Sequence, residues 1–423
     1  MSGKDQNDLV DRVAGIVLAG GQGTRLFPLT KTRCKPAVGF GGRYRLIDIP
    51  LSNALNSKIN RLFVISQYFA SNLHQHILGT YRFDLFKEGG IELLCPEEDI
   101  GEKKVWFEGT ADAVRKNLHH LLKAPVDYYL ILSGDQLYNI DLVDLLEFAR
   151  NTNAEMVVAS LHVAEEEAHR MGVMRIDETF HIKEFKEKPK TKPELKPFEV
   201  KKDGKTCYLA SMGIYVFRRD ILISLLEEPG VDFGHHLIPF QAAKGGSYAY
   251  IYDGYWVDIG TIASFYEANM SLLNQHHCLQ TYNEANPIYT RPHNLPSPLI
   301  VNTRVNRSYI SQGSVIEADE VDHSIIGIRC RIGKGTKIRN SILMGHQSYS
   351  APLHQHPPLP QNFTIGDNCV IEKTIIDENT CIGNNVRLIN KDKLETYDGE
   401  GVCIRDGIII VTTGTQLPDN FTL

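Results

Sequence analysis

Residues 15–36 combine an apolar run, a glycine-rich loop and two cations in a short stretch. Three glycines follow the apolar run within four positions: Gly20, Gly21 and Gly23. Such a loop brings backbone N–H groups close to phosphate oxygens. Arg25 offers a planar guanidinium and Lys35 a compact ammonium, and both bind phosphate well. The pattern predicts a loop that binds a nucleoside triphosphate; the alternative is an ordinary glycine turn beside surface cations.

Two well-known phosphate-binding loops do not fit this stretch. A P-loop needs Gly-x4-Gly-Lys-Ser/Thr, which is missing here. A dinucleotide-binding loop needs a third glycine three positions after Gly23, and Leu26 stands there.

Composition narrows the class of protein. The chain has 423 residues, 42% of them hydrophobic and 23% charged, which is typical of a globular protein of two or three domains. A net charge of −6 argues against nucleic-acid binding. The first twelve residues are polar, no apolar run is long enough to span a membrane, and the eight cysteines show no zinc-type spacing. We therefore expect a cytoplasmic protein without a membrane partner.

Buried strands alternate with helices over the first 150 residues. We predict strands at 16–19, 61–65, 91–95 and 128–132, a helix near Ser52, and helices at 70–78 and 109–122 with Thr110 as a cap. This order predicts an α/β fold with a doubly wound, mostly parallel sheet. Ligands bind at the carboxyl ends of such strands, where the glycine loop, Gln67 and Asp135 lie.

The second half of the chain changes character. After a strand at 156–163, a hairpin at 173–185, a Lys-rich loop at 190–206 and a helix at 262–273, irregular residues 276–297 read as a linker. Beyond it, apolar residues recur every six positions, at Ile326, Ile332, Ile338 and Met344, and glycines follow isoleucines. This spacing predicts a parallel β-helix with a loop at 346–362. The predicted domains are 1–275, 276–297 and 298–423.

Several segments resemble the ADP-glucose pyrophosphorylases (glucose-1-phosphate adenylyltransferases), within the sugar-nucleotide pyrophosphorylase superfamily. The segments are LAGGQGTRL (18–26), FGGRYRLID (40–48), WFEGTADA (106–113), EKP (187–189), ASMGIYVF (210–217) and WVDIGT (256–261). The resemblance implies a catalytic domain followed by a left-handed β-helix for regulation and oligomerisation. It also implies transfer of the adenylyl group of ATP to α-D-glucose 1-phosphate with Mg²⁺, for glycogen-type or starch-type glucan synthesis.

The resemblance assigns roles residue by residue. Arg25, Lys35 and Asp135 would be catalytic, and Asp135 and Asp258 would bind the metal ion. The ATP-binding residues would be Gly20, Gly21, Gly23, Thr24, Gln67, Trp106, Phe107, Gly109 and Thr110. The residues for glucose 1-phosphate would be Gly172, Glu187, Lys188 and Ser211.

Each assignment has a plainer alternative. Asp135 could cap a helix, Asp258 could stabilise a turn, and Lys188 could be a solvated cation in a Lys-rich stretch. Trp106 and Phe107 could simply fill the core.

The resemblance also implies a homotetramer that binds anionic metabolites as effectors. Arg43 and Arg405 match basic positions of the effector site, whereas Thr413 stands where a lysine is expected. Two other functions stay open: a nucleotidylyltransferase that uses UTP, GTP or dTTP, and a catalytically silent regulatory subunit of the same architecture.

Overall fold

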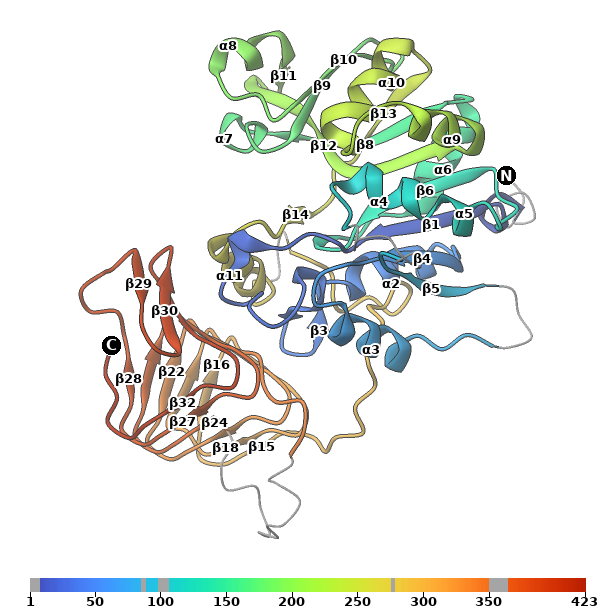
Figure 1. Ribbon diagram of the computed structural model, residues 1–423. Coiled ribbons are helices and arrows are strands. Elements are labelled where there is room, and N and C mark those ends of the chain that lie inside the picture. The colour runs from blue at the N-terminus through green and yellow to red at the C-terminus, as the bar shows by residue number, and fades with distance from the viewer. Residues whose placement is uncertain (1–7, 85–88, 98–105, 275–277, 350–363) are drawn as a thin grey trace. The chain divides into compact units, whose positions relative to one another are not determined.

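The computed structural model describes residues 8–84, 89–97, 106–274, 278–349 and 364–423 (Figure 1). The chain forms two compact units. Unit 1 consists of Met1–Gly21, Ile49–Trp256 and Thr281–Tyr289, and unit 2 consists of Gln22–Asp48, Val257–Gln280 and Thr290–Leu423. Among the described helices, none has both the length and the apolar composition needed to cross a lipid bilayer.

Unit 1 is built on a ten-stranded mixed sheet. Its main path runs in the order β10 (Ile182–Glu187), β9 (Gly172–Ile176), β12 (Lys205–Arg218), β6 (Tyr128–Ser133), β1 (Val13–Leu18), β4 (Arg61–Ile65) and β5 (Gly90–Leu94). The remaining strands are β11 (Glu199–Lys202), β8 (Met156–Val163) and β13 (Ser247–Ile251). β6, β1, β4 and β5 are parallel neighbours, and β12 pairs antiparallel with β6, β8, β9 and β11. The parallel core matches the predicted doubly wound sheet.

Helices cover the sheet of unit 1 and connect its strands (Figure 1). The described structure includes α2 (Asp48–Asn56), α3 (Ala70–Thr80), α4 (Thr110–Lys116), α5 (Leu118–Leu121), α6 (Leu142–Asn151), α7 (Glu165–Ala168), α8 (Lys192–Leu195), α9 (Arg219–Glu227), α10 (Ile238–Lys244) and α11 (Ile262–Ser271), and residues 8–11 are also helical. Short 3₁₀ turns lie at η1 (Thr24–Leu26), η2 (Lys35–Ala37) and η3 (Lys196–Phe198), and a π turn lies at η4 (Phe233–Leu237). Apolar side chains of α4, α5, α9 and α10 pack with those of β1, β6 and β12 in one buried cluster.

Three local predictions for unit 1 are wrong. The predicted helix near Ser52 begins at Asp48, so Ser52 lies inside α2 rather than near its start. The predicted helix at 109–122 is divided at Asn117 into α4 and α5, and Thr110 is the first helical residue rather than the cap. The Lys-rich stretch 190–206 is not a plain loop, because it contains α8, η3 and β11, whose Glu199–Lys202 pairs with β12.

The C-terminal part of unit 2 is a parallel β-helix with three sheets. The first sheet contains β15 (Leu299–Ile300), β18 (Val315–Ile316), β21 (Arg331–Ile332), β24 (Thr364–Ile365), β27 (Cys381–Ile382) and β32 (Gln416–Leu417). The second contains β16 (Arg304–Asn306), β19 (Glu320–Asp322), β22 (Lys337–Arg339), β25 (Val370–Glu372) and β28 (Arg387–Leu388). The third contains β17 (Tyr309–Ile310), β20 (Ile325–Ile326), β23 (Ile342–Leu343), β26 (Thr374–Ile376), β31 (Ile408–Val411), β30 (Val402–Arg405) and β29 (Thr396–Asp398).

Stacked apolar columns form the core of the β-helix, as the six-residue spacing predicts. One column follows the register Ile316, Ile332, Ile365, Ile382 and Leu417, all of them buried. In the third sheet the column position of β23 is Leu343, which pairs with Ile326 and Ile376, and not Met344 as the spacing suggested. The spacing fails there because the coil from Ile326 to Leu343 is one residue shorter than three strict six-residue repeats.

Glycines after the column isoleucines allow the coils to stack closely. A Cβ at Gly333 would lie 2.2 Å from Asp367 Oδ1 and 2.8 Å from the backbone of Gly366. A Cβ at Gly366 would meet Asn384 and Gly383 in the same way. The glycines found in the sequence are therefore explained by backbone packing between coils.

The remaining elements of unit 2 precede the β-helix in the chain. They are η1, η2, the antiparallel pair β2 (Gly39–Phe40) and β3 (Tyr44–Arg45), and α11. Gly42 O accepts hydrogen bonds from Ser311 Oγ and from the N–H of Ile328, both in the β-helix. Two short strands, β7 (Gln136–Tyr138) and β14 (Trp256–Asp258), complete the chain. Most of the loop predicted at 346–362 lies outside the described residues.

Candidate active site

The carboxyl ends of β1, β4 and β6 gather several predicted residues of unit 1. Ala19 donates its N–H to Ile65 O at 2.8 Å, and Gly134 donates to Leu18 O at 3.0 Å. Gln67 Nε2 donates to Gly20 O at 3.0 Å, so the side chain after β4 holds the start of the glycine loop. Parallel register places these three strand ends at one edge of the sheet, where such folds bind ligands.

Gln67 also fixes the aromatic segment that the sequence associates with the nucleotide base. Its Oε1 accepts the N–H of Phe107 at 2.9 Å. Phe107 is buried in the main apolar cluster, so the core-packing alternative holds for this side chain. Trp106 is 45% exposed and stacks on Tyr68 with the ring centroids 4.8 Å apart, so this alternative fails for Trp106. An exposed, fixed indole face is suited to stacking on a planar ligand.

The first turn of α4 is anchored by Thr110. Its Oγ1 donates to Asp232 Oδ2 and accepts the N–H of Phe233, each at 3.0 Å. The N–H groups of Ala111 and Asp112 donate to Val231 O. A Cβ at Gly109 would lie 2.3 Å from Val231 O, so glycine is required for this close approach.

Asp135 follows β6 at the same edge. It is partly buried, and Ser133 Oγ donates to its Oδ1. Nearby Tyr138 is fully buried, and burial together with the charge of Asp135 raises the pKa of its phenol. In the described structure the Tyr138 hydroxyl has no hydrogen-bond partner. The hydrogen bond from Ser133 shows that Asp135 is a positioned carboxylate rather than a helix cap.

The residues predicted for the sugar phosphate lie around the end of the β9–β10 hairpin. Glu187 pairs with Gly172, and a Cβ at Gly172 would lie 2.6 Å from Glu187 Oε2. Lys188 has a left-handed backbone, with φ of 45°, and its N–H donates to Met171 O at 3.0 Å. Its Nζ lies 3.1 Å from Glu187 Oε1, while the side chain is 53% exposed. Lys188 is thus partly solvated yet has a fixed backbone and a carboxylate beside it.

Ser211 lies on β12, one residue beyond the pairing of Ala210 with Val173 of β9. It is buried, its Oγ donates to the Tyr215 hydroxyl at 3.3 Å, and it accepts the N–H of Gly213 at 3.2 Å. Burial raises the pKa of Tyr215, and the charge of Glu187 raises it further. The structure therefore groups Gly172, Glu187 and Lys188 by direct contact and places Ser211 on the adjoining strand.

Unit 2 contains the loop cations and the second predicted carboxylate. Lys35 is buried within η2, and its Nζ lies 3.9 Å from Asp258 Oδ1. Gly260 lies beside both Asp258 and Arg25: a Cβ there would lie 3.2 Å from Asp258 Oδ2 and 3.6 Å from Arg25 Nη1. Arg25 itself is exposed. Two cations and one carboxylate are therefore brought together from stretches more than 200 residues apart in sequence.

Local backbone structure explains how this group is held. Gly23 has a φ of +64°, which favours glycine, and its carbonyl accepts a 2.9 Å hydrogen bond from Thr30 Oγ1. Thr24 opens η1 and is exposed, as is Gly21. After Asp258, Thr261 caps α11 in a capping box with Ser264, which fixes the turn that carries the carboxylate.

A buried ionic cluster next to Lys35 was missed in the sequence. Arg33 donates to Asp377 Oδ1, and its Nη1 lies 3.0 Å from Glu378 Oε2. Arg45 Nη1 lies 3.3 Å from Glu378 Oε1. Although burial opposes it, the charges of Arg45 and Arg33 lower the pKa of Glu378, whereas burial raises the pKa of Asp377 to about 6. The cluster ties the segment that carries Lys35 to the β-helix.

One signal could have revealed this cluster. Asp377 follows Ile376 in the third sheet, at the position that Gly327 takes after Ile326. A charged residue at a glycine position of a regular repeat indicates a specific partner. No comparable sequence pattern indicated the hydrogen bond of Thr110 to Asp232 or the stacking of Trp106 on Tyr68.

The two predicted effector residues make separate contacts within unit 2. The guanidinium of Arg43 lies over the Tyr44 ring, 5.5 Å from its centroid, and the residue is exposed. Arg405 is paired with Asp398 and donates to Tyr397 O at 2.9 Å. Thr413 donates its hydroxyl to Glu378 O at 2.9 Å.

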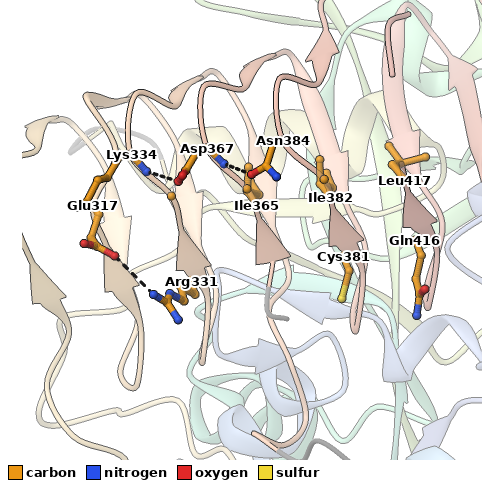
Figure 2. Close-up of a pocket in the computed structure, with 13 residues that line it drawn as sticks. Glu317, Arg331, Lys334, Ile365, Asp367, Cys381, Ile382, Asn384, Gln416 and Leu417 are labelled. Atoms are coloured by element: carbon orange, nitrogen blue, oxygen red, sulfur yellow. Dashed lines mark hydrogen bonds and ion pairs between the residues drawn. The ribbon is translucent and has the colours of Figure 1, made fainter. Parts of the chain in front are cut away.

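A groove of about 740 Å³ lies on the first sheet of the β-helix. Figure 2 shows its polar groups bonded to each other along the stack of coils. The N–H of Lys334 donates to Asp367 Oδ1 at 2.8 Å, and the N–H of Asp367 donates to Asn384 Oδ1 at 2.9 Å. Among the described lining residues, none is a predicted site residue. The groove thus follows from coil stacking, and the candidate active site lies elsewhere.

Comparisons with known families agree with this arrangement. Residues 14–275 match the nucleotidyl transferase family, and residues 293–422 match the GLGC left-handed parallel beta-helix domain. The two matches confirm the predicted fold class, an α/β nucleotidyltransferase domain followed by a left-handed β-helix. This pair of domains supports the transfer of a nucleotidyl group to a sugar 1-phosphate. Because the first match covers more than half of the sequence, the chain belongs to the nucleotidyl transferase family.

Proposed function

We propose that this chain transfers the adenylyl group of ATP to α-D-glucose 1-phosphate, giving ADP-glucose and pyrophosphate. The observation that carries the proposal is the grouping of Arg25, Lys35 and Asp258 after the glycine loop. Two cations suit a triphosphate, and a neighbouring carboxylate suits a divalent ion that accompanies it. The proposed product supplies glucosyl units for glycogen-type or starch-type glucan synthesis.

In the proposed reaction, a phosphate oxygen of glucose 1-phosphate attacks the α-phosphorus of ATP. The new phosphorus–oxygen bond forms as the bond to the bridging oxygen breaks, and pyrophosphate leaves with the electron pair. Such transfers depend mainly on positioning and on stabilising negative charge. Arg25 and Lys35 bind the triphosphate and stabilise the leaving pyrophosphate. The buried position of Lys35 strengthens its interaction with phosphate, because little water competes for the ammonium.

We propose Asp135 and Asp258 as the ligands of Mg²⁺. The donor chemistry fits, because Mg²⁺ prefers carboxylate and water oxygens, and both side chains are partly exposed. When bound, the ion neutralises phosphate charge in the transition state. Ser133 orients the Asp135 carboxylate, and Lys35 lies beside that of Asp258.

Selection of the base and of the sugar is assigned to unit 1. For ATP, we propose the exposed face of Trp106, the backbone of Phe107, Gly109 and Thr110, and the loop glycines Gly20 and Gly21 of unit 1. Gly23 and Thr24, which belong to unit 2, complete the proposed ATP-binding residues. Gln67 acts through its hydrogen bonds to Gly20 and Phe107, which hold these two segments. For glucose 1-phosphate, Lys188 binds the phosphate and Glu187 and Ser211 bind hydroxyls, with Gly172 leaving room beside Glu187.

Regulation and assembly follow from the resemblance alone and stay predictions. We propose a cytoplasmic homotetramer that responds to anionic metabolites through Arg43. Arg405 is already paired with Asp398, so an anion there would have to compete with this carboxylate. Light scattering would test the tetramer, and activity with fructose 1,6-bisphosphate or 3-phosphoglycerate would test the effectors.

A competition experiment tests the proposed reaction. The purified chain is incubated with Mg²⁺, ¹³C-labelled glucose 1-phosphate and equal amounts of ATP, UTP, GTP and dTTP, and the products are identified by mass spectrometry. We expect labelled ADP-glucose as the main product. A different labelled nucleotide sugar would assign another nucleotidylyltransferase activity, and no nucleotide sugar would favour the silent regulatory subunit.

A further inference from the structure

Three potential metal ligands converge on the surface of unit 1, outside the candidate active site. Glu97 follows the edge strand β5, and His119 and His120 lie in α5. Their ligand atoms all lie within 4.8 Å of one another. Within the part of the chain that the structure describes, this is the one group of three His, Cys, Asp or Glu residues that meets this condition.

The two imidazoles approach different oxygens of one carboxylate. His120 Nε2 lies 3.1 Å from Glu97 Oε1, and His119 Nε2 lies 3.6 Å from Glu97 Oε2. The imidazole rings are tilted by 43° with their centroids 4.0 Å apart. A simple surface ion pair needs only one imidazole, whereas two imidazoles directed at one carboxylate resemble one side of a coordination shell.

The distances between the imidazole nitrogens and the Glu97 oxygens fit tetrahedral coordination of an ion if the side chains rotate slightly. In a tetrahedral zinc site with bonds of about 2.0–2.2 Å, neighbouring ligand atoms lie about 3.3 Å apart. The two observed nitrogen–oxygen distances lie on either side of this value. The His119 and Glu97 side chains are 57% and 67% exposed and have room to rotate, whereas His120, at 20%, is the more fixed partner.

The donor set identifies the class of ion. Two imidazole nitrogens and one carboxylate oxygen suit Zn²⁺ and neighbouring transition metals, while Mg²⁺ prefers oxygen ligands alone. Three protein ligands leave one tetrahedral position for water. Sequence spacing did not reveal this group, because Glu97 lies 22 residues before His119 and no repeated His or Cys motif is present.

We propose that Glu97, His119 and His120 form a site for a Zn²⁺-class divalent ion, separate from the Mg²⁺ of the reaction. The ion would join the segment after β5 to α5. Asn117 links α5 directly to α4, whose first turn carries Thr110. Binding therefore stabilises the part of unit 1 that we assign to the base, since ligand binding to the folded state alone raises stability.

Metal binding by the full chain tests this site. The protein is freed of metal with a chelator, kept reduced, and titrated with Zn²⁺ by calorimetry in excess Mg²⁺; Co²⁺ is used as a spectroscopic probe. We expect one equivalent of Zn²⁺ per chain, tetrahedral-type Co²⁺ absorption, and a rise in melting temperature of about 5 °C at saturating Zn²⁺. Affinity should fall when the pH is low enough to protonate imidazole.

Matched variants decide where the ion binds. His120→Asn and Glu97→Gln should weaken Zn²⁺ binding by at least about tenfold, in line with the loss of one ligand. His235→Asn, from the other adjacent histidine pair of unit 1, should bind Zn²⁺ like the unaltered chain. So should Cys95→Ser, which removes an alternative pair of metal ligands, since the Cys95 thiol lies 3.7 Å from His74 Nε2. No binding by the unaltered chain, equal binding by the Glu97 and His120 variants, or loss of binding in Cys95→Ser would overturn the proposal.

Discussion

At the residue scale, Lys35 and Asp258 form the charged group on which the proposed reaction depends. Their side-chain atoms lie 3.9 Å apart, and Arg25 flanks the same turn beside Gly260. The functional proposal depends on carboxylate charge at Asp258 and at Asp135. We expect Asp258→Asn and Asp135→Asn each to reduce kcat at least about 100-fold, because charge stabilisation in the transition state is lost.

Circular dichroism and the melting temperature serve as the control for these two variants, because asparagine preserves side-chain shape and should leave both unchanged. A variant with nearly normal kcat would remove that residue from the metal role. Comparing the two also tests whether Asp135 and Asp258 contribute equally.

Lys188 gives a second residue-scale prediction. The Lys188 side chain is about half exposed and its ammonium lies beside Glu187, so it is accessible to a phosphate. Lys188→Ala should raise KM for glucose 1-phosphate by about tenfold or more and change KM for ATP by less than about twofold. Lys190→Ala, an exposed lysine two positions away, is the matched control. Equal effects of Lys188→Ala on both substrates would contradict the assignment.

At the scale of elements, the first turn of α4 depends on one hydroxyl. Thr110 Oγ1 bridges Asp232 and the N–H of Phe233. Thr110→Val removes both hydrogen bonds, so we expect KM for ATP to rise about fivefold and the melting temperature to fall by about 3 °C. Thr110→Ser keeps the hydroxyl and should restore both values. Failure of serine to restore them would show that the methyl group, not the hydroxyl, matters.

The sequence predicted elements well where one signal dominates. The apolar run at residues 61–65 and the stacked isoleucines of the β-helix identify their structure because each signal reflects burial directly. Predictions failed where contacts between distant parts of the chain determine the local structure. The Lys-rich stretch 190–206 contains a strand because β11 pairs with β12, and Leu343 takes the position predicted for Met344 because that coil is one residue shorter than the repeat. The repeat could indicate that Asp377 is exceptional, but it could not identify Arg33 as its partner, because the two residues lie 344 positions apart.

At the scale of the whole molecule, the buried ion pair of Arg33 with Asp377 links the segment that carries Lys35 to the β-helix. Burial raises the pKa of Asp377 to about 6, above its value in an unfolded chain. The folded state therefore favours protonated Asp377, and this contribution to stability is present at low pH and lost as the pH rises through about 6. One carboxylate oxygen, Oδ2, has no hydrogen-bond partner in the described structure, which agrees with a costly buried charge.

Asp377→Asn tests this effect because asparagine resembles the protonated carboxyl group. Melting temperatures of the variant and the unaltered chain should be similar near pH 4. As the pH rises to about 7, the variant should become the more stable of the two by about 5 °C. A variant that is less stable at neutral pH would show that the ion pair with Arg33 outweighs the cost of burial.

The rate of pyrophosphate release from ATP and glucose 1-phosphate with Mg²⁺ is the decisive measurement for the proposed reaction. We expect steady release by the unaltered chain that requires both substrates and falls at least about 100-fold in Asp258→Asn. Release that does not require glucose 1-phosphate, or that survives unchanged in Asp258→Asn, would contradict the proposed reaction and its assigned residues. No release by the unaltered, folded chain would contradict the claim that this chain is itself a catalyst.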